Sequence, residues 1–195
     1  MNIVETYTKR LERKDVKGFM KILDNVNFAF KSYGDITRNY IDRRCSLGIF
    51  EGNGNLVGVT MFGKNIPIEY CNSKNYLQRN LIALRKVYDI AGPKAAALVF
   101  VAVPENQRRK GFGTRLIDAT VEETKKSFGS PSLSFYLFVD AEINSDLQQK
   151  DFWEAYSKKG KHYTQLIRGE IIQDSGKIET LLGGVIHCNS DNYSF

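Results

Sequence analysis

The stretch Glu105-Asn106-Gln107-Arg108-Arg109-Lys110-Gly111-Phe112-Gly113-Thr114-Arg115-Leu116 joins an apolar run, residues 95–103, to a segment with helical periodicity that continues to Phe128. The sequence therefore predicts a buried strand, a basic turn with two glycines, and a helix, in that order. The first backbone N–H groups of a helix have no acceptor within the helix and lie at the positive end of its dipole. Because glycine lets an anion approach these groups closely, we expect the turn to bind a phosphate or pyrophosphate.

The spacing of the glycines separates this turn from two other phosphate-binding motifs. A Walker A loop ends in Gly-Lys followed by Ser or Thr, which is absent, and a dinucleotide-binding loop needs a third glycine after Gly113. The pattern that remains, Arg108-x-x-Gly111-x-Gly113 after a valine-containing strand, resembles motif A of the GNAT superfamily of acetyl-CoA-dependent N-acyltransferases. The alternative is a solvated basic turn that only caps a helix. The resemblance implies an α/β fold, with a mixed central sheet of about seven strands and flanking helices, over residues 1–195 as a single domain.

The resemblance also implies acetyl-CoA as the co-substrate and assigns the residues that hold it. The main chain at the end of the strand is expected to pair with the pantetheine arm, and the turn is expected to surround the pyrophosphate. The residues concerned are Val101, Ala102, Val103, Arg108, Arg109, Lys110, Gly111, Phe112, Gly113 and Thr114. We expect the side chains of Arg109, Lys110 and Arg115 to reach the 3′-phosphate or to face water. The side chains of Val101 and Val103 are expected in the core, because only their main chain is needed for the contact.

A second resemblance concerns the proton donor. GNAT sequences often carry an aromatic pair and then Tyr-x-x-x-Gly on the helix after the second parallel strand, and here Phe152-Trp153 precedes Tyr156 and Gly160. The resemblance implies that Tyr156 protonates the sulfur of the departing coenzyme A; the alternative is a tyrosine that only packs on its helix. Phe152 and Trp153 are expected in the core. The asparagine that the family often carries earlier on this helix has no clear counterpart, and Gln149 lies nearest to its position. No general base can be assigned, because the predicted cofactor strand contains no carboxylate.

Periodicity elsewhere predicts the remaining elements. Strands are expected at 2–9, 47–51, 56–62, 95–103, 133–140, 163–173 and 178–188, and helices at 15–30, 35–45, 77–88, 111–128 and 145–159. Asp15 is the expected N-cap of the first helix. The helix at 77–88 is an insertion before the cofactor strand, where the family often has only a turn. Its basic residues either face solvent or form a surface that binds an acidic acceptor.

Composition limits the class of protein. Hydrophobic residues make up 42% and charged residues 26% of the chain, which is typical of a globular protein in water. The longest apolar run is too short to cross a bilayer, and no secretory signal is visible at the start, so no membrane association is expected. The three cysteines are isolated, which favours a reducing compartment, the cytoplasm by default, and argues against a disulfide framework or a metal site.

These observations predict an N-acetyltransferase that moves an acetyl group from acetyl-CoA to a primary amine by direct attack in a ternary complex. The acceptor is expected to be a small molecule, a peptide or a protein. A homodimer is one assembly that the sequence leaves open. Because the net charge is +6, a second alternative is a GNAT-fold protein that acts on nucleic acid. Residues 56–63 followed by an extra helix are faintly similar to Mom-type DNA-modifying proteins of phages, and basic GNAT proteins that acetylate charged tRNA are another precedent. A non-catalytic acyl-CoA-binding module is the third alternative.

Overall fold

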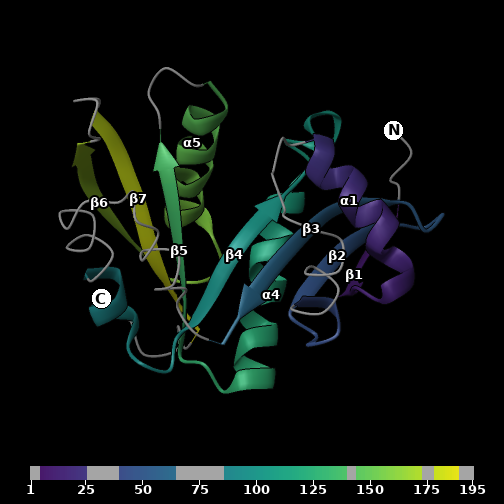
Figure 1. The fold of residues 1–195 in the computed structure, drawn as a ribbon, viewed down its shortest axis with the longest axis horizontal. Coiled ribbons are helices and arrows are strands. Elements are labelled where there is room, and N and C mark those ends of the chain that lie inside the picture. Colours follow the sequence, from purple (N-terminus) through teal and green to yellow (C-terminus); the bar gives the residue numbers. More distant parts are fainter. Residues whose placement is uncertain (1–4, 26–39, 65–85, 140–143, 173–177, 189–195) are drawn as a thin grey trace. The chain divides into compact units, whose positions relative to one another are not determined.

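The computed structural model describes residues 5–25, 40–64, 86–139, 144–172 and 178–188. Seven strands form one mixed sheet in the order β1-β2-β3-β4-β5-β7-β6, with helices flanking it, which confirms the predicted fold class (Figure 1). The strands are β1 (Thr6–Arg10), β2 (Ser46–Glu51), β3 (Leu56–Gly63), β4 (Ala96–Ala102), β5 (Ser132–Val139), β6 (Thr164–Ile172) and β7 (Ile178–His187). The helices are α1 (Val16–Asn25), α4 (Phe112–Phe128) and α5 (Asn144–Lys159), with short 3-10 turns η1 (Arg13–Asp15) and η4 (Glu105–Gln107). Residues 86–91 are also helical.

The chain divides into two compact units. Unit 1 comprises Met1–Gly63 with Leu98–Glu122, and unit 2 comprises Lys64–Ala97 with Glu123–Phe195. The first two residues of β4 therefore belong to unit 2 and the rest of that strand to unit 1, while α4 begins in unit 1 and ends in unit 2.

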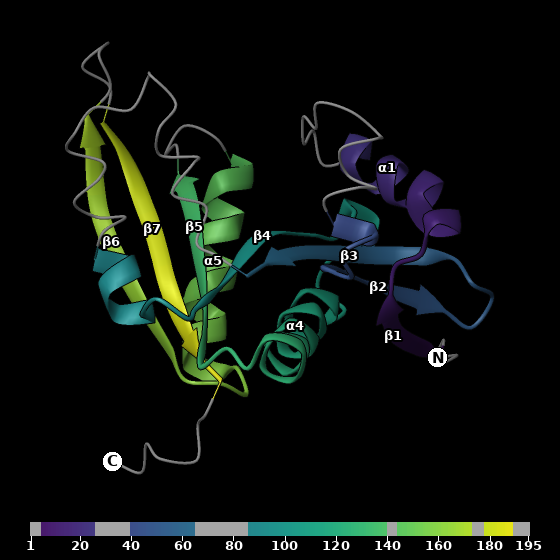
Figure 2. The same ribbon diagram turned by 60° about the horizontal axis from the view of Figure 1, so that its bottom comes forward.

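In unit 1, strands β1, β2 and β3 form an antiparallel ladder with β1 at its edge. The β2–β3 hairpin closes through Gly54, whose φ of +83° suits glycine. Figure 2 shows α1 on one face of β2 and β3 and the first turns of α4 on the other face. Successive strand residues point to opposite faces, so each strand supplies side chains to both helices.

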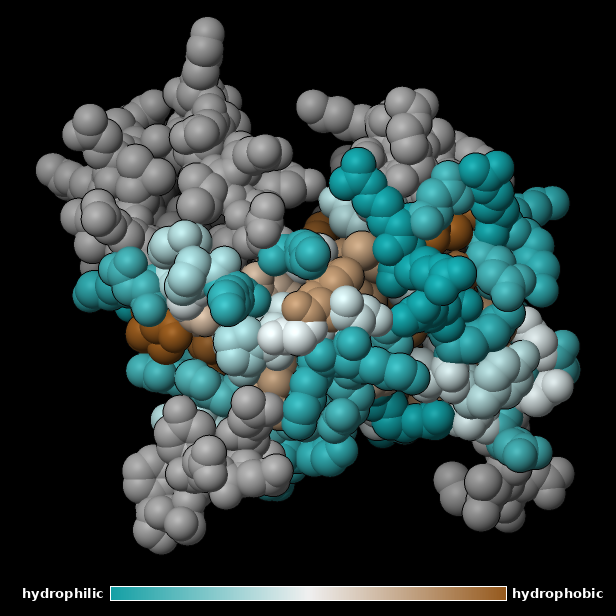
Figure 3. Space-filling view, turned by 90° about the horizontal axis from the view of Figure 1, so that it is seen from below, coloured by the Kyte–Doolittle hydropathy of each residue, from teal (hydrophilic) through white to brown (hydrophobic). Residues whose placement is uncertain are grey.

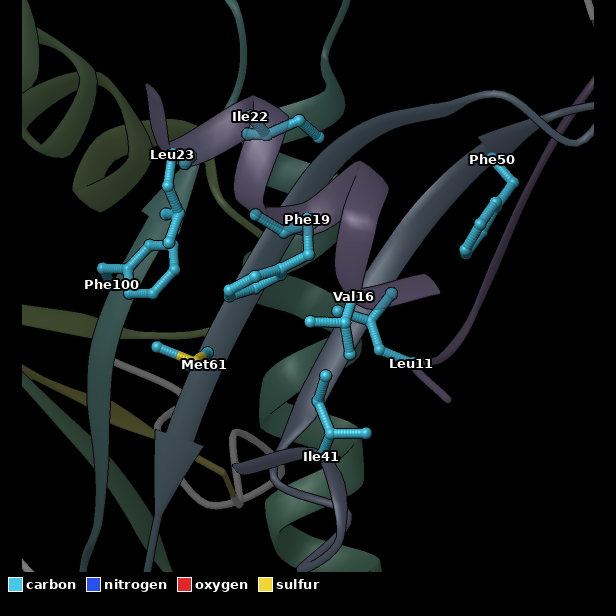
Figure 4. Close-up of a cluster of buried hydrophobic side chains, with 11 residues drawn as sticks. Leu11, Val16, Phe19, Ile22, Leu23, Ile41, Phe50, Met61 and Phe100 are labelled. Atoms are coloured by element: carbon cyan, nitrogen blue, oxygen red, sulfur yellow. The ribbon is translucent and has the colours of Figure 1, made fainter. Parts of the chain in front are cut away.

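A core cluster of unit 1 lies between α1 and the sheet (Figure 4). Phe19 of α1 packs against Phe100 of β4, with ring centroids 6.0 Å apart. The helix forms here because its apolar residues recur at a spacing of three and four and so share one face. The buried members of the cluster are Leu11, Val16, Phe19, Ile22, Leu23, Ile41, Phe50, Val59, Met61, Phe100 and Ala102.

In unit 2, β7 lies between β5 and β6 and pairs antiparallel with both. The start of β4 pairs parallel with β5 through Ala96 with Leu133 and Ala97 with Ser134, and α4 provides the crossover that parallel strands need. On one face, Val185 of β7 packs in a cluster with Val87 and Ala91 of the 86–91 helix. Trp153 of α5 stacks on Phe135 of β5, with centroids 3.7 Å apart and ring planes 13° apart.

Several predictions of detail need correction or lie outside the described residues. Asp15 does not cap α1 with its side chain: its carboxylate accepts the N–H of Glu12 at 2.9 Å, which closes the preceding 3-10 turn η1 instead. The position of β7 between β5 and β6 was not predicted, since hairpin periodicity does not say which strand joins the sheet. The expected helix at 35–45 is described only from residue 40, and the inserted helix only from residue 86.

One face of the described part of the chain is mainly polar. On the face that Figure 3 shows, hydrophilic side chains cover most of the coloured area and hydrophobic ones appear in small patches. The large hydrophobic residues that are exposed in the described part of the chain are Tyr7, Ile90 and Tyr163. Within that part, no helix combines the length and the hydrophobicity needed to cross a bilayer.

Replacement of Gly184 by alanine is expected to lower the free energy of unfolding by about 1–3 kcal/mol through overpacking. A Cβ atom at this position would lie 2.5 Å from Cζ of Phe135 and 3.0 Å from the main-chain oxygen of Gln165. Phe135 cannot turn aside easily, because its ring is stacked on Trp153. Gly63→Ala is the matched control, since a Cβ there would meet nothing within 4 Å. Urea unfolding of both variants checks the prediction, and equal stabilities would contradict it.

His187 is expected to make the stability of the fold depend on pH. Burial lowers the pKa of its imidazole below the ordinary value, so the unfolded chain binds a proton more readily than the folded one. The stability that this difference provides is present above the unfolded pKa of about 6.5 and is lost as the pH falls through the folded pKa. Urea midpoints of wild type and His187→Gln at pH 7.5 and at lower pH should converge on acidification. Parallel pH profiles for the two proteins would refute this role.

Candidate functional site

The predicted turn lies between β4 and α4 in unit 1. The chain leaves β4 at Ala102 and folds tightly at η4, where the N–H of Gln107 donates to the carbonyl of Pro104 at 2.9 Å and that of Arg108 donates to the carbonyl of Glu105 at 3.1 Å. The first helical hydrogen bond of α4 runs from the N–H of Arg115 to the carbonyl of Gly111 at 3.0 Å. Gly111 therefore occupies the N-cap position and has no side chain to cover the helix start.

The backbone N–H groups at the start of α4 have no acceptor among the described residues. Arg109 has φ of +62° and Gly111 has φ of +78°, so the chain enters the left-handed region twice just before the helix. A Cβ placed on Gly111 would meet no atom within 4 Å. In the part of the chain that the structure describes, no acceptor receives the N–H groups of Phe112, Gly113 or Thr114. A helix start of this kind favours an anion with several oxygens.

Three basic residues directly precede these N–H groups in the chain. Arg109 and Lys110 are exposed, and Nζ of Lys110 donates to the amide oxygen of Gln107 at 2.7 Å, a neutral partner that leaves the positive charge uncompensated. Nε of Arg108 donates to the carbonyl of Val103 at 3.3 Å and so ties the turn to the end of β4.

Arg115 has a role that the sequence did not suggest. Its guanidinium donates to the hydroxyl of Thr6 and, at 3.2 Å, to the carbonyl of Thr6. The side chain therefore links the first turn of α4 to the edge strand β1, where the sequence analysis expected contact with a 3′-phosphate or with water. Thr6 lies far from this turn in the sequence, and no local pattern marks the pair.

The side chains at the end of β4 lie at the border of a core cluster, where the sequence analysis expected Val101 and Val103 inside the core. Val101 and Val103 are half-buried and pack in a cluster with Phe112 and Leu116 of α4. Ala102 is buried on the opposite face, among the residues that pack under α1. The parallel ladder between β4 and β5 contains two residue pairs and ends at Ala97.

Tyr156 lies in unit 2, on α5, and only 3% of its surface is exposed. It belongs to an aromatic cluster of this helix, with its ring centroid 6.2 Å from that of Phe152 and 6.0 Å from that of Trp153. Trp153 is buried in the core as predicted, whereas Phe152 is half-buried. The structure also explains the spacing Tyr-x-x-x-Gly. The N–H of Gly160 donates to the carbonyl of Tyr156 at 2.7 Å, and a Cβ at Gly160 would lie 2.6 Å from that oxygen and 3.0 Å from the phenol ring.

Comparison with known proteins agrees with the geometry of the turn. The family model described as the acetyltransferase (GNAT) family matches residues 19–149, well over half of the chain. A search of curated protein sequences gave no significant match.

Solved structures share the fold at low sequence identity. Diaminobutyrate acetyltransferase EctA from Paenibacillus lautus, solved with L-2,4-diaminobutyric acid and coenzyme A, has a TM-score of 0.59 at 14% identity, covering 99% of each chain. Arylalkylamine N-acetyltransferase 2 from Aedes aegypti has a TM-score of 0.61 at 15% identity, covering 95% of this chain and 100% of its own. The ribosomal-protein-S18-alanine N-acetyltransferase from Escherichia coli has a TM-score of 0.54 at 14% identity, covering 98% and 100%.

These structures show the fold, and the family match shows more than the fold. It includes the whole of β4, the glycine-containing turn and α4, which are the elements that build the candidate site. The chain belongs to the acetyltransferase (GNAT) family.

Proposed function

We propose that this enzyme transfers the acetyl group of acetyl-CoA to a primary amine by direct attack in a ternary complex. The observation that carries the proposal is the turn at residues 108–114, where N–H groups of a helix start without acceptors in the described chain stand beside exposed cations. Coenzyme A has a pyrophosphate that suits such a turn. One of the structurally similar enzymes, the diaminobutyrate acetyltransferase, was solved with coenzyme A.

Three groups of residues would hold the co-substrate. The N–H groups of residues 112–114 would bind the pyrophosphate, and the side chains of Arg109 and Lys110 would add positive charge beside it. The main chain of Val101, Ala102 and Val103 would pair with the amides of the pantetheine arm. This pairing needs strand groups that no neighbouring strand uses, and the short β4–β5 ladder, which ends at Ala97, supports it.

The bound thioester supplies an activated acetyl group. The protein must provide the proton transfers that accompany the reaction. The attacking amine must lose a proton and the departing thiolate must gain one. We assign the second task to Tyr156, whose phenol O–H can donate a proton. Its ring is fixed by packing against Phe152, Trp153 and Gly160, and a fixed ring lets a donor hold one direction. Side-by-side binding of amine and thioester would supply much of the acceleration, up to about 7–11 kcal/mol in well-oriented cases.

The names of the similar enzymes support a primary amine as the acceptor. Two of them are named for small amines, diaminobutyrate and arylalkylamines, and the third for the alanine of a ribosomal protein. Each name denotes an acceptor with a primary amine. Thiol release with small diamines, arylalkylamines and peptides with free N-termini tests this proposal. If charged tRNA were the acceptor instead, as the net charge of +6 allows, its acetylation would be strongly weakened by salt.

Gly111→Ala is expected to weaken acetyl-CoA binding by about tenfold or more. At a φ of +78°, a residue with a side chain raises the conformational energy of the backbone by about 1–2 kcal/mol. The turn must therefore either remain strained or change the positions of its N–H groups. Gly54→Ala is the matched control, because Gly54 has φ of +83° and equally open surroundings but lies in the β2–β3 hairpin. Isothermal titration should show lower affinity only for Gly111→Ala. Equal affinities of the two variants, or no binding by folded wild-type protein, would contradict the assignment of the turn.

Tyr156→Phe is expected to lower kcat by about 10²–10⁴-fold and to leave the KM for acetyl-CoA nearly unchanged. Phenylalanine keeps the buried ring and removes only the hydroxyl. Tyr163→Phe is the control, since it is the same chemical change at an exposed tyrosine of unit 2. The assay is steady-state thiol release at saturating amine. Full activity of Tyr156→Phe would exclude this residue as the acid.

A further inference from the structure

Exposed lysines gather at one end of the sheet in unit 2. Strands β5 and β6 begin at this end and β7 finishes there, as the arrows of Figure 2 show. Ser132 at the start of β5 pairs with His187 at the end of β7. The N–H of His187 also donates to the carbonyl of Tyr163, directly before β6, at 2.9 Å. Segments that are distant in the sequence therefore meet at this end.

The segments that lead into these strands carry the lysines. Helix α4 has two lysines in its last turn, shortly before β5, and α5 ends in two lysines shortly before β6. The connection into β4 carries another one, and the pairing of Ala96 with Leu133 places that connection at the same end. The exposed residues that make up this lysine surface are Lys94, Lys125, Lys126, Lys158, Lys159 and Lys161.

Carboxylates are few around the lysine surface. No Asp or Glu occurs in the segments that enter or leave this end of the sheet, which are 90–97, 124–139, 155–169 and 180–188. The nearest carboxylates on the two helices are Glu122, Glu123 and Glu154. Glu154 forms an ion pair with Arg168 at 2.6 Å, and Glu123 accepts a hydrogen bond from the hydroxyl of Ser127.

The positive charge of the lysine surface is therefore not balanced. Asp89, on the 86–91 helix, is the nearest carboxylate before Lys94 in the chain. When this residue and the three glutamates are all counted, the six lysines and Arg168 still exceed the carboxylates by seven to four. Within the described part of the chain, no ion pair is formed by the lysines at 94, 125, 126, 158 and 159. A surplus of this kind favours a polyanion.

An exposed aromatic ring lies beside these charges. Tyr163 follows Lys161 closely in the chain, and 39% of its surface is exposed. Its ring stacks on the imidazole of His187, with centroids 5.3 Å apart and ring planes 29° apart. The imidazole supports the phenol ring, and the exposed part of that ring is open to another flat group. Nucleic-acid bases provide such a group, whereas an acidic peptide would use the lysines alone.

We propose that the lysine surface binds a single-stranded nucleic acid. The phosphodiester groups contact the lysines, and an unpaired base stacks on Tyr163. Lysine binds phosphate as a point charge, and phosphate contacts do not read the bases, so the binding is independent of sequence. The lysine surface shares no residue with the turn at 108–114. Binding there is a property separate from the proposed acetyl transfer and does not rest on it.

The test is fluorescence anisotropy of labelled oligo-U and oligo-dT of about 12 nucleotides, titrated with the full chain in the absence of acetyl-CoA. A saturable rise is expected with at least one strand, and the two arms distinguish RNA from DNA. Three to five phosphate contacts predict that log K falls with log salt with a slope of about −2 to −4. No saturable rise, or equal binding by polyglutamate of the same length, would overturn the proposal.

A pair of double variants tests the position of the surface. Lys158→Gln with Lys159→Gln should weaken binding at low salt by about tenfold and make the salt slope shallower by about 1–1.5, because two phosphate contacts are lost. Lys17→Gln with Lys21→Gln is the matched control, since it removes the same charge from two exposed lysines of α1 in unit 1. Equal losses in both double variants would mean that net charge alone attracts the strand, and would refute the assigned surface.

Replacement of the exposed tyrosine tests the stacking. Tyr163→Ser should weaken binding by about fivefold or more, whereas Tyr163→Phe keeps the ring and should bind as wild type does. Tyr7→Ser is the control in unit 1, where an exposed tyrosine stacks on Phe50 with centroids 5.6 Å apart. Melting temperatures show that each variant is folded, and Lys125→Gln with Lys126→Gln replaces the α5 pair if that pair is not. Full affinity of folded Tyr163→Ser would contradict the stacked base.

Discussion

The start of α4 is held in place by its packing on the sheet of unit 1, and the candidate site depends on this contact. Phe112 and Leu116 lie on the face of the helix that meets Val101 and Val103 of β4, together with residues of β2 and β3. A glycine in β3, Gly58, lets the helix come close, since a Cβ there would lie 3.1 Å from Leu116. Arg115 adds a hydrogen-bonded link from the same helical turn to Thr6 of the edge strand. Because the first turn is fixed on two sides, its N–H groups have a fixed direction, and a fixed direction is what electrostatic recognition requires.

The same packing explains how the end of β4 can serve both the hydrophobic core and the candidate site. The apolar side chains of the β4 end serve the core, while the main chain and the turn that follows carry the polar groups. The buried hydroxyl of Thr60 on β3 donates to the carbonyl of Phe100 at 3.0 Å, so β4 is joined to its neighbour by a side chain as well as by the sheet. Unit 2 is built differently. Its α5 is held to β5 by the stacked pair Phe135 and Trp153, and that pair also leaves room for a residue no larger than glycine at position 184.

Much of the fold could be predicted from the sequence, because its signals are local. Hydrophobic runs, helical spacing and glycine-containing turns predicted nearly every described strand and helix to within a few residues of its observed bounds. The order of strand, turn and helix around Gly111 indicated the family that the family model then matched. What could not be predicted depends on contacts between distant segments. The pairing of β7 with β5 and the bond between Arg115 and Thr6 have no local signature. The left-handed backbone at Arg44 and Arg109 also has no local signature, because an arginine in a sequence does not reveal its backbone angle. The role of Tyr156 stays a prediction of the sequence resemblance, supported by a packed ring.

The most direct test of the central claim is a crystal structure of this enzyme with coenzyme A. Pyrophosphate oxygens are expected within hydrogen-bonding distance of the N–H groups of Phe112, Gly113 and Thr114, with the guanidinium of Arg109 beside them. Pantetheine amides are expected to pair with the main chain of Val101 to Val103. An ordered coenzyme A with its pyrophosphate elsewhere, and with these three N–H groups facing only water, would contradict the account.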